Sequence, residues 1–280
     1  MTENVHIVGA SGRSGTSLGA ALRARGTGVI PVVRDPAKWT GAETPRIADL
    51  TDPDALRAAL AGATDIVSCA HARYAPAIIA AAPPEARLFF FGSTRKFTQW
   101  PDDHGNGVLA GEAAFLASGR RGVILHPTMI YGATGENNVR RLAGVLARLP
   151  FVPLPNGGKA LVQPVHQDDL TNAVLAALDR PWDGPHSLIV AGPAAMSYAD
   201  FVRAIASAAG LPPPRLVPFP AFPLIAATWL LRFLPVGHTE IRRLLEDKAF
   251  DIAPARAALG FDPMPLHEGL ARTFAAAHDC

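Results

Sequence analysis

Cysteines, net charge and long apolar runs are all scarce in this chain, and each scarcity excludes a class of protein or site. Its only cysteines are Cys69 and Cys280, and two residues so far apart in sequence provide neither a disulfide framework nor a zinc site. The formal net charge is only +2, and no block of lysine or arginine stands out, which argues against a nucleic-acid partner. No apolar run reaches the roughly 18 residues that a membrane span requires.

The remaining composition is typical of a soluble protein of enzyme size. The 280 residues are 49% hydrophobic and 18% charged, which permits one large domain or two. The first apolar run begins within five residues of Met1, leaving no room for a secretory signal, so we expect a cytoplasmic location. His166, Asp168 and Asp169 stand close together, but no second cluster would complete a coordination shell, and we predict no metal.

The most informative segment is a glycine-rich turn near the start of the chain. The apolar residues 5–8 stop at Gly9, and glycine returns at positions 12 and 15 before a helical pattern at residues 16–25. Glycines at these positions let the turn close, let backbone N–H groups approach a diphosphate and let the helix pack on the strand. The sequence therefore predicts a dinucleotide held at a helix N-terminus.

The end of the next β-branched run bears on which dinucleotide binds. Val33 occupies the place where an acidic residue would hold the ribose hydroxyls of NAD, and Arg34 follows it. Arg34 and Lys38 can both reach a 2′-phosphate, which favours NADP(H). A register shift would place Asp35 on the ribose and favour NAD(H), and both basic residues could instead be solvated loop charges.

Beyond this unit, strands and helices continue to alternate. Apolar runs at residues 46–50, 65–70, 87–91 and 122–127 are separated by predicted helices at 53–61, 76–82 and 108–118. Continuous apolar strands separated by helices are typical of a parallel sheet that is buried on both faces. We therefore predict a doubly wound α/β (Rossmann) fold.

Six segments in the expected order resemble the short-chain dehydrogenase/reductase superfamily, in its extended and atypical branches. The chain is most similar to NmrA-like proteins and to relatives of the dinucleotide-binding accessory subunit of respiratory complex I. The epimerase/dehydratase members belong to the same superfamily. The matching segments are residues 9–15, 33–36, 49–50, 91–94, 126–132 and 163–170.

The resemblance implies a set of residues that bind the coenzyme. Several of them also have structural interpretations: Asp49 as a turn cap, Ser11 and Ser14 as partners for N–H groups at the helix start, and Pro127 as a strand end. The implied contacts are Gly9, Ser11, Gly12, Arg13, Ser14 and Gly15 along the pyrophosphate, Asp49 and Leu50 at the adenine, Ala70 and His71 at the adenosine ribose, and Pro127, Thr128 and Met129 at the nicotinamide.

The chain departs from the family at the catalytic pair. Active members carry a tyrosine and, four residues later, a lysine that lowers the tyrosine pKa. Glu112 anchors the alignment and places Val108 at the lysine position and His104 at the tyrosine position. Ser93 and Thr94 match the family hydroxyl that orients a substrate carbonyl. His104 is a candidate proton donor, although a histidine in such a polar, glycine-bounded loop is more often solvated or caps the next helix.

Three hypotheses about function remain open. The first is an NADP(H)-dependent oxidoreductase that acts on a small molecule with an unusual proton source, since the coenzyme itself performs hydride transfer. The second is a non-catalytic NAD(P)-binding redox sensor or assembly protein. The third is a nucleotide-sugar epimerase or dehydratase, against which the missing tyrosine and lysine count most.

The second half of the chain is expected to form the substrate side. We place a dinucleotide-binding domain at residues 1–190, with 131–165 contributing partly to the substrate side, and a smaller, mainly helical domain at 191–280. Arg140 and Arg141 could meet an anionic substrate or lie on a solvated helix face. A proline-rich surface connection at 211–223 leads to an apolar helix at 224–234. Such a helix must be covered by the core of its own domain, a hydrophobic substrate pocket, a subunit interface or a membrane surface, so a homodimer stays possible.

Overall fold

The computed structural model describes residues 4–132, 138–149, 151–220 and 242–275. These residues form two units that interleave along the chain, and each is described by itself. The first contains residues 1–128, 167–190 and 252–262, and the second contains the remainder. The sequence predicted a domain at 1–190, with 131–165 contributing partly to the substrate side, and a second at 191–280; in the structure, 129–166 belong to the second unit and 252–262 to the first.

The first unit is built on a seven-stranded sheet in the order β11-β6-β5-β4-β1-β2-β3, and every neighbouring pair is parallel. This arrangement confirms the predicted doubly wound fold. Its strands are β1 (Asn4–Val8), β2 (Gly28–Val33), β3 (Arg46–Ile47), β4 (Asp65–Ser68), β5 (Arg87–Phe91), β6 (Gly122–Pro127) and β11 (Pro185–Val190). Its helices are α1 (Arg13–Ala24), α2 (Pro53–Ala59), α3 (Ala75–Ala81), α4 (Asp103–Ala117), α6 (Gln167–Leu178) and α10 (Ala253–Leu259), with short 3-10 turns η1 (Pro36–Lys38), η2 (Ala72–Tyr74) and η3 (Thr94–Phe97).

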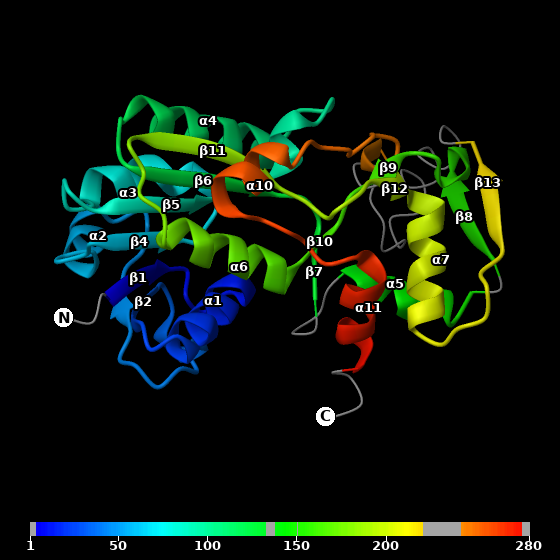
Figure 1. The fold of residues 1–280 in the computed structure, drawn as a ribbon, viewed down its shortest axis with the longest axis horizontal. Helices are drawn as coiled ribbons and strands as arrows, with labels where there is room; N and C mark the ends of the chain where they lie inside the picture. Colours follow the sequence, from blue (N-terminus) through cyan, green and yellow to red (C-terminus); the bar gives the residue numbers. More distant parts are fainter. Residues whose placement is uncertain (1–3, 133–137, 150, 221–241, 276–280) are drawn as a thin grey trace. The chain divides into compact units, whose positions relative to one another are not determined.

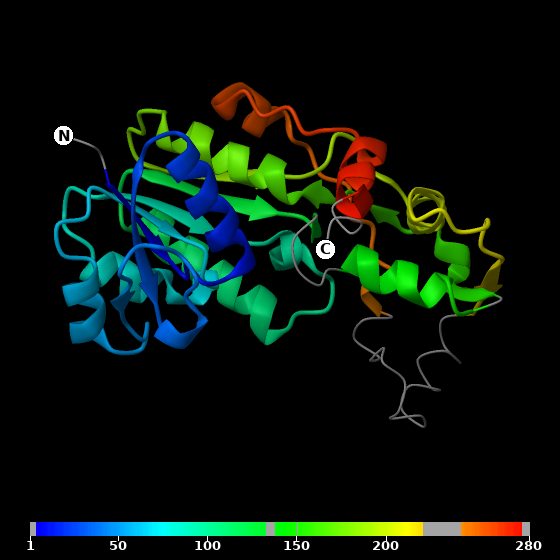
Figure 2. The same ribbon diagram turned by 90° about the horizontal axis from the view of Figure 1, so that it is seen from below.

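Helices cover both faces of this sheet (Figures 1 and 2). α1 and α6 lie on one face, while α2, α3 and α4 lie on the other. Under the second group, Leu56, Ile78 and Phe115 pack against strand residues such as Ile66 and Phe90, and all five are fully buried. Removing this apolar surface from water is the main favourable contribution to the stability of the unit.

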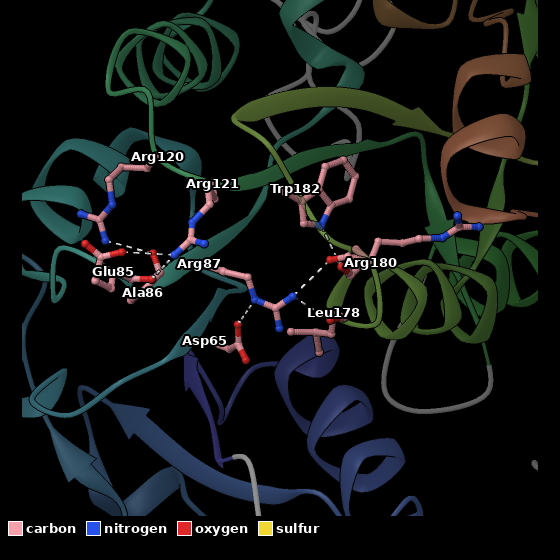
Figure 3. A network of polar contacts seen from close by, with 10 residues as sticks. Asp65, Glu85, Ala86, Arg87, Arg120, Arg121, Leu178, Arg180 and Trp182 are labelled. Atoms are coloured by element: carbon pink, nitrogen blue, oxygen red, sulfur yellow. Dashed lines mark hydrogen bonds and ion pairs between the residues drawn. The ribbon is translucent and has the colours of Figure 1, made fainter.

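A polar network lies at the end of the sheet where the parallel strands begin (Figure 3). Arg87, the first residue of β5, donates from Nε to Asp65 Oδ1 at 2.6 Å, and its Nη1 donates to the carbonyl oxygens of Leu178 and Arg180 at 3.0 and 3.1 Å. Asp65 is almost fully buried, so the ion pair compensates a charge that would otherwise be costly. The network thus joins the end of α6 to the strand starts, opposite the edge at which Rossmann folds bind ligands.

The second unit is smaller and combines short strand pairs with helices. β7 pairs with β10 and β8 with β13 in parallel, whereas β9 pairs with β12 antiparallel. Its core includes Phe201, Val202 and Ile205. Its elements are β7 (Ile130–Tyr131), α5 (Asn138–Leu146), β8 (Val152–Pro155), η4 (Asn156–Gly158), β9 (Leu161–Val162), β10 (Val165–His166), β12 (Met196–Ser197), α7 (Tyr198–Ala208), β13 (Leu216–Phe219) and α11 (Leu266–Ala275).

Three local predictions differ from the structure. α4 begins at Asp103 instead of residue 108, because the Asp102 carboxylate accepts the Gly105 N–H at 2.8 Å and caps the helix earlier. The proline-rich connection contains the strand β13, which includes Pro218. Proline is tolerated there because both strands of a two-stranded sheet are edge strands. The strand expected at 46–50 is limited to β3, and the apolar helix expected at 224–234 lies outside the described residues.

Candidate functional site

The glycine turn joins β1 to α1 with very close backbone contacts. Gly9 adopts a positive φ of 78°, and its N–H donates to the Val32 carbonyl oxygen at 2.9 Å. A Cβ atom on Gly15 would lie 2.4 Å from the Gly9 oxygen and 2.8 Å from Ala10 Cα. Because only glycine tolerates both features, the turn and the first turn of α1 fold as one compact unit.

The N-terminus of α1 is open to a ligand. Its N-cap residue is Gly12, which provides no side-chain cap, and the first helical turn carries no acidic residue. The positive end of the helix dipole is therefore not neutralised by a carboxylate of the helix itself. Ser11, Gly12 and Arg13 lie at exposed or half-exposed positions, whereas the Ser14 hydroxyl donates to Gln167 Oε1 at 3.0 Å at the start of α6.

The end of β2 presents two basic side chains. Val33 is the last strand residue and is buried, and the exposed Arg34 follows it directly. Asp35 instead caps η1, accepting the Ala37 N–H at 3.1 Å, and its other oxygen lies 3.6 Å from Lys38 Nζ. The carboxylate that would favour NAD(H) is thus engaged in local contacts.

Asp49 and Leu50, predicted at the adenine, follow β3. Asp49 forms a turn in which its carboxylate accepts the backbone N–H of Thr51 at 2.9 Å and the Thr51 hydroxyl at 2.7 Å. These hydrogen bonds, with a smaller contribution from the Arg34 charge, lower the pKa of Asp49. Leu50 packs at the edge of the core beneath α2 and α3, as does Ala70 after β4.

The structure brings together two histidines that the sequence assigned to different roles. The rings of His71, which follows β4, and His104, in the first turn of α4, meet edge to face with centroids 4.3 Å apart. His71 Nδ1 accepts the Arg73 N–H at 3.1 Å and caps η2. Burial, together with the nearby His104 and Arg73, lowers the pKa of His71 to about 4, so its ring is neutral at physiological pH.

Helix α4 carries no tyrosine and no lysine along its length. Val108, at the position of the family lysine, is buried in the core. The three tyrosines, at positions 74, 131 and 198, belong to η2, β7 and α7. The catalytic pair of the active family members is therefore missing from this helix, as the sequence indicated.

The two hydroxyls after β5 make different hydrogen bonds. Thr94 Oγ1 donates to the Pro127 carbonyl oxygen at 3.3 Å, so its proton is used within the chain. Ser93 Oγ accepts the Arg95 N–H at 3.2 Å, and its own proton is not donated to any of the described residues. Ser93 is thus the better hydrogen-bond donor of the two.

A polar cluster behind Ser93, buried except for Ser187, was not identified from the sequence. It consists of Lys96, Glu112, His126 and Ser187, which come from η3, α4, β6 and β11. The sequence pattern that could have revealed this cluster is a charged or polar residue inside an otherwise apolar segment. Glu112 and His126 both occupy such positions. Glu112 had served only to align the missing lysine.

The residues predicted at the nicotinamide belong to both units. Pro127 and Thr128 lie in the first unit, where the Thr128 N–H donates to the Val190 carbonyl oxygen at 3.1 Å, and Met129 lies in the second unit and packs on its core. Arg140 Nη2 donates to the Thr273 carbonyl oxygen at 2.9 Å. Among the described residues no cluster of histidine, cysteine or carboxylate side chains could hold a metal. None of the described helices has the length and hydropathy required to cross a bilayer.

Comparisons with known proteins identify the coenzyme region. Residues 9–96 match the model of a family described as NAD(P)H-binding. A curated relative, the 3-diazoavenalumate denitrifying reductase of Streptomyces sp, is 25% identical over 308 residues, covering 92% of this chain and 95% of the relative.

Solved structures share the fold over the full chain. MoeE5 in complex with UDP-glucuronic acid and NAD superposes with a TM-score of 0.77 at 20% identity, covering 99% of both chains. A putative epimerase from Burkholderia cenocepacia J2315 gives a TM-score of 0.78 at 20% identity, covering 100% of this chain and 99% of that one. The family match supports an NAD(P)H-binding region at residues 9–96, and the two solved structures show that the fold is shared.

Proposed function

We propose that this protein is an NADP(H)-dependent oxidoreductase that reduces a small, electrophilic molecule without a tyrosine–lysine pair. The observation that carries the proposal is the contact between Gly9 and Gly15, which builds a diphosphate cradle in front of an uncapped helix. The family match over residues 9–96 and the reductase among the relatives support the same activity.

Arg34 and Lys38 favour NADP(H) over NAD(H). Both are exposed at the end of β2, while Asp35 is turned towards the Ala37 amide. A guanidinium group forms strong, charge-assisted hydrogen bonds with a phosphate, and an unpaired carboxylate would repel one.

The chemistry of the acceptor follows from the missing proton donor. Reduction of a carbonyl creates an alkoxide that must be protonated, and α4 provides no phenol for this step. An acceptor that is already strongly electrophilic needs little acid catalysis. An arenediazonium ion, for example, reacts with NADPH to give the arene, N2 and NADP⁺: hydride supplies the electron pair of the new C–H bond, and the C–N bond breaks. The name of the Streptomyces relative describes a denitrifying reductase of a diazo compound.

The test measures NADPH consumption by a fixed concentration of the protein at saturating NADPH. Four classes of acceptor are compared: arenediazonium salts, quinones, enones and aldehydes. We expect turnover with the diazonium or quinone acceptors and little with simple aldehydes, because only the last require a strong proton donor. Tight NADPH binding without turnover on any acceptor would instead favour the non-catalytic, coenzyme-binding alternative. Turnover of a nucleotide sugar with tightly held NAD⁺ would favour the epimerase alternative. MoeE5, which shares the fold, has been solved in complex with UDP-sugars and NAD.

A further inference from the structure

Glu112 is the centre of the buried polar cluster beside the proposed site. Its carboxylate accepts hydrogen bonds from Lys96 Nζ, with both oxygens at 2.6 Å, and from Ser187 Oγ at 2.5 Å. The third contact joins Glu112 Oε1 to His126 Nε2 at 3.1 Å. The side chains of Lys96 and Glu112 are 9% and 12% exposed and that of His126 is 0% exposed, so water competes little for the contacts of Glu112 with Lys96 and His126.

The contacts of His126 define which of its ring nitrogens carries the proton. The backbone N–H of Ser93 donates to Nδ1 at 3.1 Å, so Nδ1 is the acceptor and the proton resides on Nε2, facing Glu112. The ring lies directly against Gly92, where a Cβ atom would stand 2.2 Å from Nδ1. His126 therefore links the buried carboxylate to the backbone of Ser93.

We propose that Glu112, charge-balanced by Lys96, is a positioning residue: it holds His126 in one tautomer and thereby fixes the Ser93 backbone and the direction of its hydroxyl. The proposal rests on the proposed function only in assigning the Ser93 hydroxyl to the substrate. Carboxylates fix histidine tautomers in this way in other sites, where the second nitrogen performs the function.

The charge of the cluster supports this role. Burial acts to raise the pKa of Glu112, but hydrogen bonds from His126, Lys96 and Ser187 outweigh it and lower the pKa to about 2. Glu112 is therefore an ionised acceptor throughout the physiological range. His126 Nε2 and Lys96 Nζ are 3.3 Å apart and share the same carboxylate.

Lys96 does not replace the lysine that is missing from α4, because its ammonium group is bound to both Glu112 oxygens and is nearly inaccessible. Its role is to balance the carboxylate. Without that ammonium group, the Glu112 carboxylate would lose its cationic partner, and its position against His126 Nε2 would be less firmly held.

The first experiment needs no substrate. Hydrogen exchange of the Ser93 amide and the ¹⁵N shifts of the His126 ring are measured in the wild type and in Lys96→Met, Glu112→Gln and Arg87→Met. The last is a matched control, because Arg87 forms an ion pair of the same 2.6 Å length with buried Asp65, at the end of the sheet where the strands begin. We expect Ser93 protection to fall about tenfold or more in the first two variants and to stay within about twofold in the control.

The second experiment uses turnover with the acceptor found above. In Lys96→Met and Glu112→Gln we expect kcat to fall about tenfold or more while the Kd for NADPH changes by less than about twofold, and Lys96→Arg to recover most of the loss. If the two variants do not fold, Ser187→Ala removes one exposed donor to Glu112 and should give a smaller loss in the same direction.

Retention of Ser93 protection and of the His126 tautomer in Lys96→Met would overturn the proposal. An equal loss in Arg87→Met would also overturn it, since the effect would then be general destabilisation. If no acceptor is reduced but Ser93 protection follows the variants as expected, the proposed function fails and the positioning role stands.

Discussion

Gly15 packs on Gly9 so tightly that a single added methyl group would stand 2.4 Å from a backbone oxygen. This distance is well below van der Waals contact and involves no flexible side-chain atom, so Gly15→Ala must open the turn. We expect the Kd for NADPH to rise about tenfold or more, because the amides at the start of α1 would no longer converge on the diphosphate. Isothermal titration with NADPH measures the change.

Gly144→Ala is the matched control for this substitution. Gly144 lies inside α5 with an ordinary φ, and a methyl group added there would meet none of the described residues outside its own helical turn within 4 Å. Alanine there should leave the Kd for NADPH unchanged and stabilise the helix by about 0.5–1 kcal/mol. Equal coenzyme affinities in the two variants would show that the turn does not hold the diphosphate.

The proposed preference for NADP(H) is tested at Arg34. Arg34→Ala should raise the Kd for NADPH about tenfold and leave that for NADH within about twofold, since only NADPH carries the 2′-phosphate. Arg57→Ala is the control, because Arg57 is also exposed and pairs with Asp54 on α2. Titrations of each variant with both coenzymes separate the two effects, and an unchanged NADPH affinity in Arg34→Ala would contradict the assignment.

The sheet was predictable because its signals are local. Runs such as 87–91 and 122–127 contain few polar residues, and the observed β5 and β6 coincide with them. The start of α4 was missed because it depends on the Asp102 cap, and a capping carboxylate looks like any other loop aspartate in the sequence.

The glycine turn was predictable for the same reason, but the cluster around Glu112 was not. Its members lie 16 residues apart from Lys96 to Glu112 and 75 apart from Glu112 to Ser187, and only the order of the strands brings them together. The meeting of His71 and His104 likewise depends on packing between η2 and α4. Contacts across a parallel sheet leave no periodic pattern in the sequence.

The two hydroxyls after β5 should differ in their contribution to turnover. Ser93→Ala should lower kcat about 10- to 100-fold, because it removes a donor directed at developing charge. Thr94→Val is the closest control and should have a much smaller effect, since the Thr94 proton is already donated to Pro127. Steady-state kinetics at saturating NADPH distinguishes these outcomes.

His104 is the remaining candidate acid. Its ring packs on His71, which the family resemblance places at the adenosine ribose, so we expect His104→Ala to lower kcat by less than about threefold. The substitution should also leave the pH profile of kcat unchanged. A large loss in kcat, together with the disappearance of an ionisation near neutral pH, would identify His104 as the proton donor.

Stability should fall as the solution is acidified, because His6 is held neutral in the fold. His6 is 1% exposed, and burial, assisted by Arg46, lowers its pKa from 6.5 to about 4. Below pH 6.5 the unfolded chain binds a proton at His6 that the folded chain does not, so stability decreases with falling pH until about pH 4. The shift corresponds to a loss of about 2 kcal/mol between about pH 7 and pH 5. His71 contributes in the same direction.

Urea unfolding at pH 7 and pH 5 tests this prediction. The difference in unfolding free energy between the two pH values should be smaller for His6→Gln, whose side chain stays neutral, than for the wild type. An unchanged difference would place the loss of stability at other residues.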